Sequence, residues 1–411
     1  MSSATQPTLL LFYFFAAIAI WLGLASLRGG VRFARYIKAE LVREYLEFTP
    51  FVTVFVPCRG LDAGLKENLT AVFFQDYPAF EIIVVSDSAE DPALTVVEEV
   101  RTMLDEHISP SVRIVIAGPA TDSGQKVHNL RAAVSAAGSH TEVLAFVDTD
   151  ARPERTWLRS LVRPLVDTSI GATTGYRWFV PARGGLSSHL RSVWNASIAS
   201  ALGGQSDKNF CWGGSTAIRR ATFDKLSIRE KWRGTVSDDF TMTRVLHEAE
   251  LPIKFVPQCL IPAFEDCGLR ELLEFTIRQL KITRAYAAYL WKAVLTGSLL
   301  FVLVFFGGIA LVIARASMDL SYATALVLLL VIFVLGAAKS YLRLRAVRLV
   351  IADRRLSSFG VTLAHITLWP LASLLFLCNA LAAAFSRRIT WRGITYELKS
   401  PAEAVIIHRD D

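Results

Sequence analysis

Hydrophobic residues follow two different patterns along this chain. Four long runs contain no Asp, Glu, Lys or Arg, namely residues 8–27, 293–314, 320–338 and 361–385. A helix of about 20 residues is roughly 30 Å long, which matches the hydrocarbon core of a bilayer. Between the first and second of these runs, apolar residues instead come in short stretches of strand length. The pattern therefore predicts transmembrane helices at both ends of the chain, with a folded domain between them.

The short apolar stretches predict a parallel sheet. In chain order they are FVTVFV, FEIIVV, VRIVIAG and VLAFVD, and segments of helical character separate them. Such alternation is typical of an α/β fold with a doubly wound, mostly parallel sheet, which we expect over residues 51–290. No G-x-G-x-x-G follows any of these stretches. A dinucleotide-binding domain is therefore disfavoured.

Basic residues follow the first apolar run and predict its orientation. They are Arg28, Arg32, Arg35 and Lys38. Positive charge is retained on the cytoplasmic side of a membrane helix, so we expect a basic juxtamembrane linker at 28–50 and a cytoplasmic domain after it. A secretory signal peptide would carry its basic residues before the apolar run, where this chain has none.

The second membrane region is expected at residues 291–386. The runs 293–314 and 320–338 are joined by a short connector and predict a helical hairpin. Residues 339–357 mix Arg with Leu and Val and could lie in the headgroup layer. Residues 361–385, broken by Pro370, either span the membrane or re-enter it. A re-entrant segment would keep the basic tail, residues 387–411, in the cytoplasm.

Composition adds limits on partners and compartment. The chain has 411 residues and a net charge of +7, with Lys and Arg gathered beside the apolar runs. This placement suits an anionic lipid bilayer better than nucleic acid, and no nucleic-acid module is visible. The five cysteines have no metal-ligand or C-x-x-C spacing. They predict reduced thiols facing a cytoplasm.

Two carboxylates follow the strand predicted at residues 143–147. Asp148 and Asp150 come one residue apart, at the carboxyl end where ligands of open α/β sheets bind. If strand geometry persists, both side chains project to one side and could share a divalent cation through hard oxygen ligands. A diphosphate needs such a cation. The alternative is an acidic strand-to-loop turn without a ligand.

Two further charged features stand beside predicted helices. Lys126 precedes a helix expected at 130–137, where a cation opposes the helix dipole, so an anionic partner could explain it. A solvated loop lysine is the alternative. Asp238 and Asp239 precede a helix expected at 241–248 and could be a simple N-cap. Because adjacent carboxylates raise each other's pKa, the pair is also a candidate general base.

Together these features resemble the inverting family 2 glycosyltransferases of GT-A fold, most closely the ceramide glucosyltransferase branch and its bacterial hopanoid glycosyltransferase relatives. The resemblance covers roughly residues 50–396. It implies that Asp87, in VSDSAEDPA, contacts the nucleotide base. It also implies that Asp148 and Asp150, in VDTDARP, bind metal and diphosphate. Asp239, in SDDF, would be the catalytic base, with Asp238 beside it.

The same resemblance covers shorter motifs, with departures. The P-K-x-x-N element matches GQKVHNL through Lys126 and Asn129, as donor-binding residues, with Gln125 in place of proline. The turn of small residues on the acceptor side matches Gly213, Gly214 and Ser215. The family's (Q/R)-x-x-R-W motif keeps Arg278 but has Lys281 and Ile282 for arginine and tryptophan. Lysine keeps the charge for the diphosphate without the bidentate fork.

The tail carries one more match to the branch. Trp391, Arg392, Gly393 and Tyr396 resemble its W-R-x-x-x-Y element. This match also favours a cytoplasmic tail.

The resemblance implies a membrane-bound hexosyltransferase with a cytoplasmic catalytic domain, multi-pass in a bacterial inner membrane. Its donor would be a UDP-sugar such as UDP-glucose, used with Mn or Mg, and its acceptor a hydroxyl of a membrane lipid such as ceramide or a hopanoid. One displacement would invert the anomeric carbon. The alternatives are a processive polysaccharide synthase and a catalytically silent membrane scaffold with a nucleotide-sugar pocket.

Overall fold

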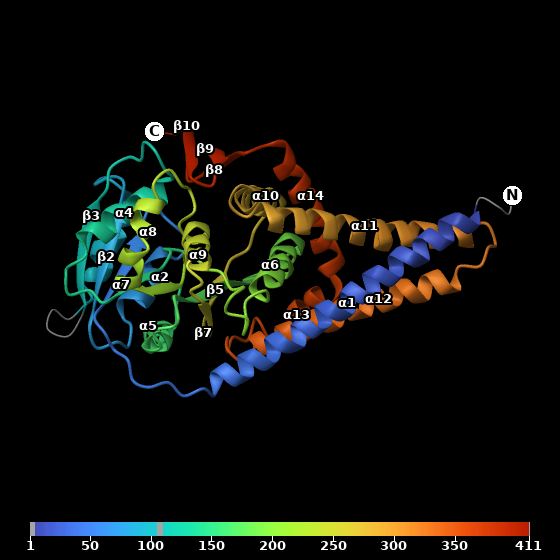
Figure 1. The fold of residues 1–411 in the computed structure, drawn as a ribbon, viewed down its shortest axis with the longest axis horizontal. Helices are drawn as coiled ribbons and strands as arrows, with labels where there is room; N and C mark the ends of the chain where they lie inside the picture. Colours follow the sequence, from blue (N-terminus) through green and yellow to red (C-terminus); the bar gives the residue numbers. More distant parts are fainter. Residues whose placement is uncertain (1–4, 105–109, 411) are drawn as a thin grey trace.

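A seven-stranded sheet forms the centre of the domain, in the order β3-β2-β1-β4-β6-β5-β7. The structure is a computed structural model that describes residues 5–104 and 110–410 (Figure 1). The strands are β1 (Val52–Pro57), β2 (Phe80–Ser86), β3 (Ser111–Ile116), β4 (Val143–Phe146), β5 (Ala172–Val180), β6 (Thr216–Arg219) and β7 (Ile253–Phe264). Strands β1 to β4 pair in parallel, β5 pairs with β7 in parallel, and only β6 runs antiparallel to its neighbours. The predicted α/β class with a mostly parallel sheet is confirmed.

Helices cover both faces of this sheet, which explains why its inner strands are continuous apolar runs. On one face Val54, Ile82 and Ala145 pack with Leu69 and Trp157, and on the other face a second cluster forms beneath different helices. The helices around the sheet are α2 (Leu65–Phe73), α3 (Pro92–Arg101), α4 (Gln125–Ala136), α5 (Trp157–Val162), α6 (Leu186–Ala199), α7 (Arg220–Lys225), α8 (Ile228–Lys231), α9 (Asp238–Glu248) and α10 (Leu269–Tyr286), with a 3-10 turn at Arg163–Val166.

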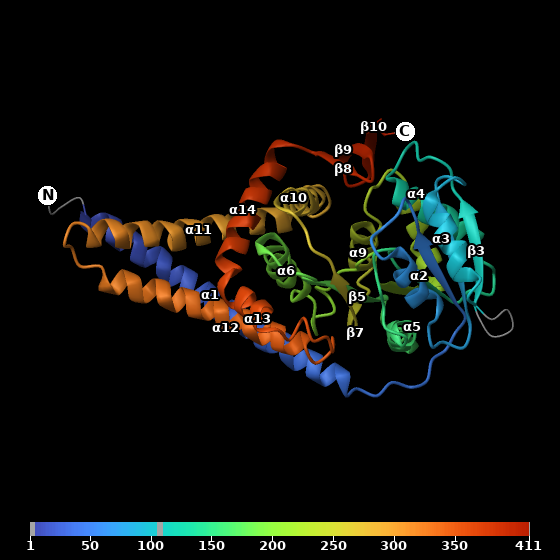
Figure 2. The same ribbon diagram turned by 180° about the vertical axis from the view of Figure 1, so that it is seen from behind.

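Three long helices project away from the sheet domain. They are α1 (Thr5–Leu41), α11 (Ala288–Ala316) and α12 (Ala323–Val347), and each is long and apolar enough to cross a membrane. The amino end and the connection between α11 and α12 lie together at the tip farthest from the sheet (Figures 1 and 2). Apolar helices therefore stand at both ends of the chain, and the protein is a membrane protein.

The expected linker at 28–50 is helical over its first half. Helix α1 continues unbroken to Leu41 because Phe33 and Ile37 are buried against the domain, where Phe33 stacks on Phe255. Residues 339–347 were expected to begin an interfacial segment, but they are the last turns of α12, with Leu344 and Val347 in the same cluster. Both long helices are thus fixed to the domain by apolar packing.

The last apolar segment is bent. Helices α13 (Phe359–Thr367) and α14 (Trp369–Phe385) meet at 58°, with Pro370 in the first turn of α14. Pro370 lacks the N–H that a continuous helix would need, which accounts for the break. Helix α14 then leads back toward the sheet domain, so the tail lies on the same side of the long helices as the domain (Figure 1).

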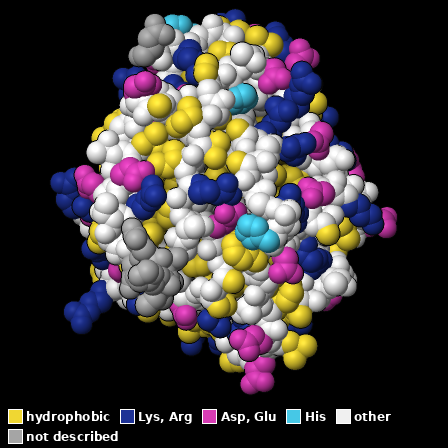
Figure 3. All heavy atoms as spheres, turned by 90° about the vertical axis from the view of Figure 1, so that its left-hand side faces the viewer, with side chains coloured by type: hydrophobic (Ala, Val, Ile, Leu, Met, Phe, Trp, Pro, Cys, Tyr) yellow, Lys and Arg dark blue, Asp and Glu magenta, His cyan; other side chains and the backbone are white. Residues whose placement is uncertain are grey.

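The tail forms a small antiparallel sheet against the domain. Its strands are β8 (Arg388–Trp391), β9 (Ile394–Ser400) and β10 (Glu403–Arg409). Their inner side packs Ile394 and Tyr396 against Ile282 and Val236. The domain face turned away from the long helices mixes Lys, Arg, Asp and Glu among apolar side chains (Figure 3). Charges of both signs are thus spread over this face.

Candidate active site

One large cavity joins the sheet domain to the long helices. Its volume is about 1100 Å³. Charged residues line its domain side, namely Arg59, Lys126, Asp148, Asp150, Arg177, Asp238, Asp239, Arg278 and Arg392. Apolar residues of the long helices and α14 line the rest, among them Leu22, Leu300, Ile332, Leu335 and Phe376. A ligand with a polar group at the domain and an apolar body among the helices would fit its shape and chemistry.

Asp148 and Asp150 lie in a turn beyond β4. The strand ends at Phe146, and the N–H of Ala151 donates to the carbonyl of Asp148 at 3.1 Å. Strand geometry therefore does not persist, and the two carboxylates contact different cations. Lys126 Nζ is 2.7 Å from Asp148, and Arg177 is 2.9 Å from Asp150. Burial, reinforced by Asp148 and opposed by Arg177, raises the pKa of Asp150.

Lys126 joins two carboxylates from different elements. It stands in the first turn of α4, and its Nζ is also 3.2 Å from Asp238 of α9. Burial acts to lower the pKa of Lys126, but Asp148, Asp238 and Asp239 together outweigh burial and raise it. The lysine is therefore fully charged at neutral pH. Only 15% of the Lys126 side chain is exposed, so Lys126 is not the solvated loop lysine that was the alternative prediction.

The two adjacent aspartates have different surroundings. Ser237 caps α9, with its Oγ accepting from the N–H of Phe240. Asp238 is buried, and its pKa is raised, first by burial and then by Asp239 and Asp148, against the effect of Lys126. Asp239 is half-buried and accepts hydrogen bonds from Ser237 Oγ and from the N–H of Phe240. None of the ion pairs among the described residues includes Asp239.

Arg278 lines the cavity, whereas Lys281 does not. Burial lowers the pKa of Arg278, and Arg392 and Arg177 add to the effect. Three guanidiniums so placed suit an anionic ligand such as a diphosphate. Lys281 Nζ instead donates to the carbonyl of Arg388 in β8 at 2.7 Å. The ammonium group of Lys281 is therefore bound to the tail sheet. The structure gives no support to the predicted donor-binding role of Lys281.

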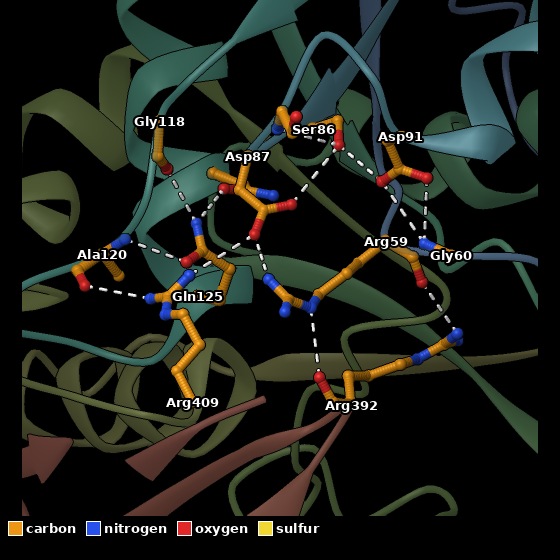
Figure 4. A network of polar contacts seen from close by, with 12 residues as sticks. Arg59, Gly60, Ser86, Asp87, Asp91, Gly118, Ala120, Gln125, Arg392 and Arg409 are labelled. Carbon is orange, nitrogen blue, oxygen red and sulfur yellow. Dashed lines mark hydrogen bonds and ion pairs between the residues drawn. The ribbon is translucent and has the colours of Figure 1, made fainter. Parts of the chain in front are cut away.

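Asp87 lies behind the cavity rather than in its lining. It pairs with Arg59, and Arg409 of the tail is 3.6 Å away (Figure 4). Arg59 also donates to the carbonyl of Arg392 at 3.1 Å. A nucleotide base could reach Asp87 only where these arginines leave room. Asp87 was expected to contact the base directly, and its observed ionic contacts are with Arg59 and Arg409.

Gln125, in place of the family's proline, connects α4 to the tail. Its N–H donates to Tyr396 Oη at 3.1 Å, and its side-chain Nε2 donates to Asn129 Oδ1. The same side-chain amide accepts from Ala120 N–H and donates to the carbonyl of Gly118 (Figure 4). Asn129 lines the cavity and is buried. The start of α4, which carries Lys126, is therefore positioned in part by the tail.

Gly213, Gly214 and Ser215 pack behind the charged residues. A Cβ on Gly213 would lie 2.6 Å from both Asp238 Oδ2 and Lys126 Nζ, so a larger residue would displace this ion pair. Ser215 is fully buried, and its Oγ accepts from Trp157 Nε1 at 2.7 Å. The three turn residues are not among the described residues that line the cavity, whereas Cys211 and Trp212, which precede the turn, are. Its observed contacts are thus with the catalytic candidates rather than with the space for a ligand.

The family model for glycosyl transferase family 21 matches residues 11–404, nearly the whole chain. The chain belongs to glycosyl transferase family 21. The predicted resemblance to ceramide glucosyltransferases is thereby confirmed, as is the GT-A fold. The matched family is one of glycosyltransferases.

Individual relatives of this family 21 chain are distant. Ceramide glucosyltransferase 1 of Caenorhabditis elegans is 33% identical over 88 residues, which is 21% of this chain and 18% of that protein. The mannosyltransferase PcManGT from Pyrobaculum calidifontis, in complex with GDP-Man and Mn2+, is 19% identical with a TM-score of 0.48, over 90% of this chain and 98% of its own. Glucosyl-3-phosphoglycerate synthase from Mycobacterium tuberculosis, in complex with Mn2+ and UDP-glucose, is 17% identical with a TM-score of 0.36. This match covers 61% of this chain and 81% of that chain. Neither structure bears on the donor or acceptor of this family 21 chain.

Two carboxylates of the family 21 chain are suitable ligands for a divalent cation. Asp148 and Asp150 offer hard carboxylate oxygens at one cavity, and their mutual repulsion would be relieved by a cation. No third His, Cys, Asp or Glu joins them within the part of the chain that the structure describes. A magnesium-type site commonly has one or two carboxylates and completes its shell with substrate phosphates and water.

Two arginines of the site, Arg59 and Arg177, belong to none of the sequence motifs, and Arg392 was matched only as part of the tail element. Arg59 directly follows β1, so its position at the carboxyl end of a strand was a usable signal. Arg177 lies within β5, and Arg392 reaches Asp62 from the tail at 2.6 Å. Neither has a local pattern that indicates its partner, because each pair joins segments far apart in the chain.

Proposed function

We propose that this protein is an inverting hexosyltransferase that moves a sugar from a UDP-sugar, UDP-glucose or a relative, to a hydroxyl of a membrane lipid such as ceramide or a hopanoid. The observation that carries the proposal is the single cavity that extends from Asp148 and Asp239 to the apolar helices α1, α11 and α12. A lipid could enter it from the bilayer with its hydroxyl toward the carboxylates. Family membership supports the transfer chemistry.

In this proposal the chain's own residues bind and neutralise the donor. Arg278 and Lys126 attract the diphosphate, with Arg392 and Arg177 adding positive charge nearby. Asp148 and Asp150 would hold Mn or Mg, which supplies charge neutralisation for the leaving diphosphate. Asn129 lines the cavity one helical turn from Lys126 and would contact the donor. Asp87 would act through Arg59, which lines the cavity beside it.

Asp239 is proposed as the general base. It lines the cavity and makes no ion pair with the described side chains, so its carboxylate is not held by a cation in direct contact. It would take the proton of the lipid hydroxyl while that oxygen attacks the anomeric carbon and the nucleotide diphosphate leaves from the opposite side. A single displacement of this kind inverts the anomeric centre. Asp238, paired with Lys126, would position the charged groups around it.

We also propose the organisation of the chain in the membrane. Residues 51–290 would be the cytoplasmic catalytic domain, and residues 8–27 and 291–386 the membrane regions of a multi-pass protein in a bacterial inner membrane. The tail, residues 387–411, would be cytoplasmic. The close packing of the tail sheet on the domain supports this arrangement.

Transfer by the purified protein in nanodiscs tests the proposal. Each candidate lipid is supplied with UDP-glucose and Mn2+, and the UDP released and the lipid products are measured by mass spectrometry, with Asp239→Asn as the matched inactive control. A singly glycosylated lipid that depends on Asp239 supports the proposal. A polymer would indicate the processive synthase, and absence of any product with a range of lipids and donors would indicate the silent scaffold.

A further inference from the structure

Two cations stand in the membrane-side part of the cavity. Lys339 and Arg343 are one turn apart on α12 and line the same cavity as Asp239. Residues four apart lie on one face of a helix, so the two charges point to the same space. Arg343 is 3% exposed. Charges on membrane helices that face an interior cavity commonly mark the site of a ligand.

Neither cation has a carboxylate partner among the described residues. Lys339 Nζ donates to Ser26 Oγ at 2.7 Å, and Arg343 donates to Ser200 Oγ at 3.4 Å. Arg343 Nε is buried without an acceptor in the part of the chain that the structure describes. A buried charge that is not paired is costly, so an anion beside Arg343 and the half-buried Lys339 would offset that cost. The domain end of the cavity differs, because Lys126 and Arg177 have aspartate partners there.

Two tryptophans that line the cavity also carry buried hydrogen-bond donors. The Nε1 groups of Trp194 and Trp369 are buried, and each lacks an acceptor among the described residues. The unsatisfied polar atoms of this cavity's lining are thus all donors. A phosphate or a carboxylate presents several acceptor oxygens and a negative charge, which matches this set.

We propose that Lys339 and Arg343 bind the acidic group, a phosphate or carboxylate, of the lipid that occupies the cavity. The inference rests on the proposed function in making this lipid the acceptor. It favours an acceptor that carries an acidic group beside its reactive hydroxyl over a neutral lipid such as ceramide or a hopanoid. The apolar body of the lipid would lie among Leu300, Ile332 and Phe376.

A neighbouring arginine provides the matched control. Basic residues near the end of a membrane helix often extend to the headgroup layer without binding any one lipid. Arg345, also on α12, is exposed and lies outside the cavity lining. Arg345→Met removes the same charge from the same helix without changing the cavity. Lys339→Met and Arg343→Met keep most of the side-chain volume while they remove the cations.

Lipid retention tests the binding site without requiring activity. The full-length protein in neutral detergent is mixed with phosphatidylglycerol or with diacylglycerol of the same acyl chains, and native mass spectrometry measures the bound lipid. We expect wild type and Arg345→Met to prefer phosphatidylglycerol. Lys339→Met and Arg343→Met should each lower its retention about tenfold, the scale of one charge-assisted hydrogen bond. Equal retention of the two lipids by wild type, or an equal loss in Arg345→Met, would overturn the site.

Transfer assays on the same preparations test the acceptor. Phosphatidylglycerol and diacylglycerol both carry a free hydroxyl, so each can be offered with the donor. A preference for the acidic lipid that Lys339→Met and Arg343→Met abolish supports the inference. Transfer to the neutral lipid that these variants leave unchanged overturns it. Selective binding with no transfer to any lipid would overturn the proposed function and leave the anion-binding site supported.

Discussion

At the scale of single residues, the carboxylates of the candidate site differ in their partners. Asp148 and Asp238 share Lys126, and Asp150 pairs with Arg177. Asp239 differs, because its contacts are hydrogen bonds from Ser237 and the backbone. A carboxylate that is held in place but not neutralised by a cation can accept a proton during reaction.

Replacement of Asp239 is therefore expected to affect transfer more than binding. Asp239→Asn should lower the rate of sugar transfer by roughly 100- to 10,000-fold, the scale of a lost general base, while donor affinity stays nearly constant. Single-turnover transfer and donor binding are measured separately. Asp238→Asn is the matched comparison and should reduce transfer less. A larger loss in Asp238→Asn would reverse the two roles.

Arg177 is expected to compete with a divalent cation for Asp150. In Arg177→Met the half-buried carboxylate of Asp150 loses its 2.9 Å partner, so Mn2+ affinity without donor should rise by about tenfold, the scale of one charge-assisted hydrogen bond. Mn2+ affinity is measured by titration, with the free Mn2+ detected by electron paramagnetic resonance. Asp150→Asn should have the opposite effect, and Arg183→Met, at a side chain that is 94% exposed, should have none. Unchanged affinity in Arg177→Met would mean that Asp150 is not a ligand.

At the scale of elements, the tail sheet and the start of α4 depend on each other. Tyr396 is buried and accepts the N–H of Gln125, directly beside Lys126. The backbone N–H at this position exists only because glutamine replaces the family's proline. Gly124 is extended, with φ −61° and ψ 142°, and Gln125 is the first residue of the helix, so proline would also fit.

This contact predicts a non-additive pair of substitutions. Tyr396→Phe should destabilise the protein by about 1–3 kcal/mol, because it leaves a buried N–H without an acceptor. In a Gln125→Pro background that N–H is absent, so the same tyrosine substitution should cost less. Thermal unfolding of the four proteins of the cycle measures the difference. Equal costs in both backgrounds would show that the contact contributes nothing to stability.

At the scale of the whole molecule, the chain forms a domain at one end and a helical tip at the other. The amino end of α1 and the connection between α11 and α12 share that tip (Figure 2). The tail returns to the domain, so the domain and tail lie on one side of any bilayer that the long helices cross. Because the basic residues of α1 lie toward the domain, we predict that this side of the membrane is the cytoplasm.

Cysteine labelling is expected to show this sidedness. Met318, between α11 and α12, is 65% exposed, and Thr121 is an exposed residue of the domain. With Cys378 replaced by Ser, an impermeant maleimide should label Met318→Cys in intact cells and Thr121→Cys only after permeabilisation. The opposite pattern would place the catalytic domain outside.

The sequence by itself determined the fold class and the location of most site residues. Apolar runs buried on both faces must be inner strands, and long uncharged runs must be apolar helices, so local patterning was sufficient. The carboxyl ends of parallel strands meet at one edge of a sheet, so Asp148 and Lys126, which follow two such strands, could be placed near each other from the sequence. Family motifs added Asp239 and Arg278, and both line the cavity.

Only the tertiary structure decided which charges meet. Arg177 and Asp150 are 27 residues apart, and Arg392 reaches Asp62 across 330 residues, so no local pattern connects them. The turn after Phe146 gave Asp148 and Asp150 different cationic partners, and Lys281 donates to the carbonyl of Arg388 in the tail sheet. Side-chain partners depend on long-range packing, whereas hydrophobic period is a property of each segment. That difference is why the sequence predicted the elements, while the ion pairs and the cationic pair at Lys339 and Arg343 required the folded chain.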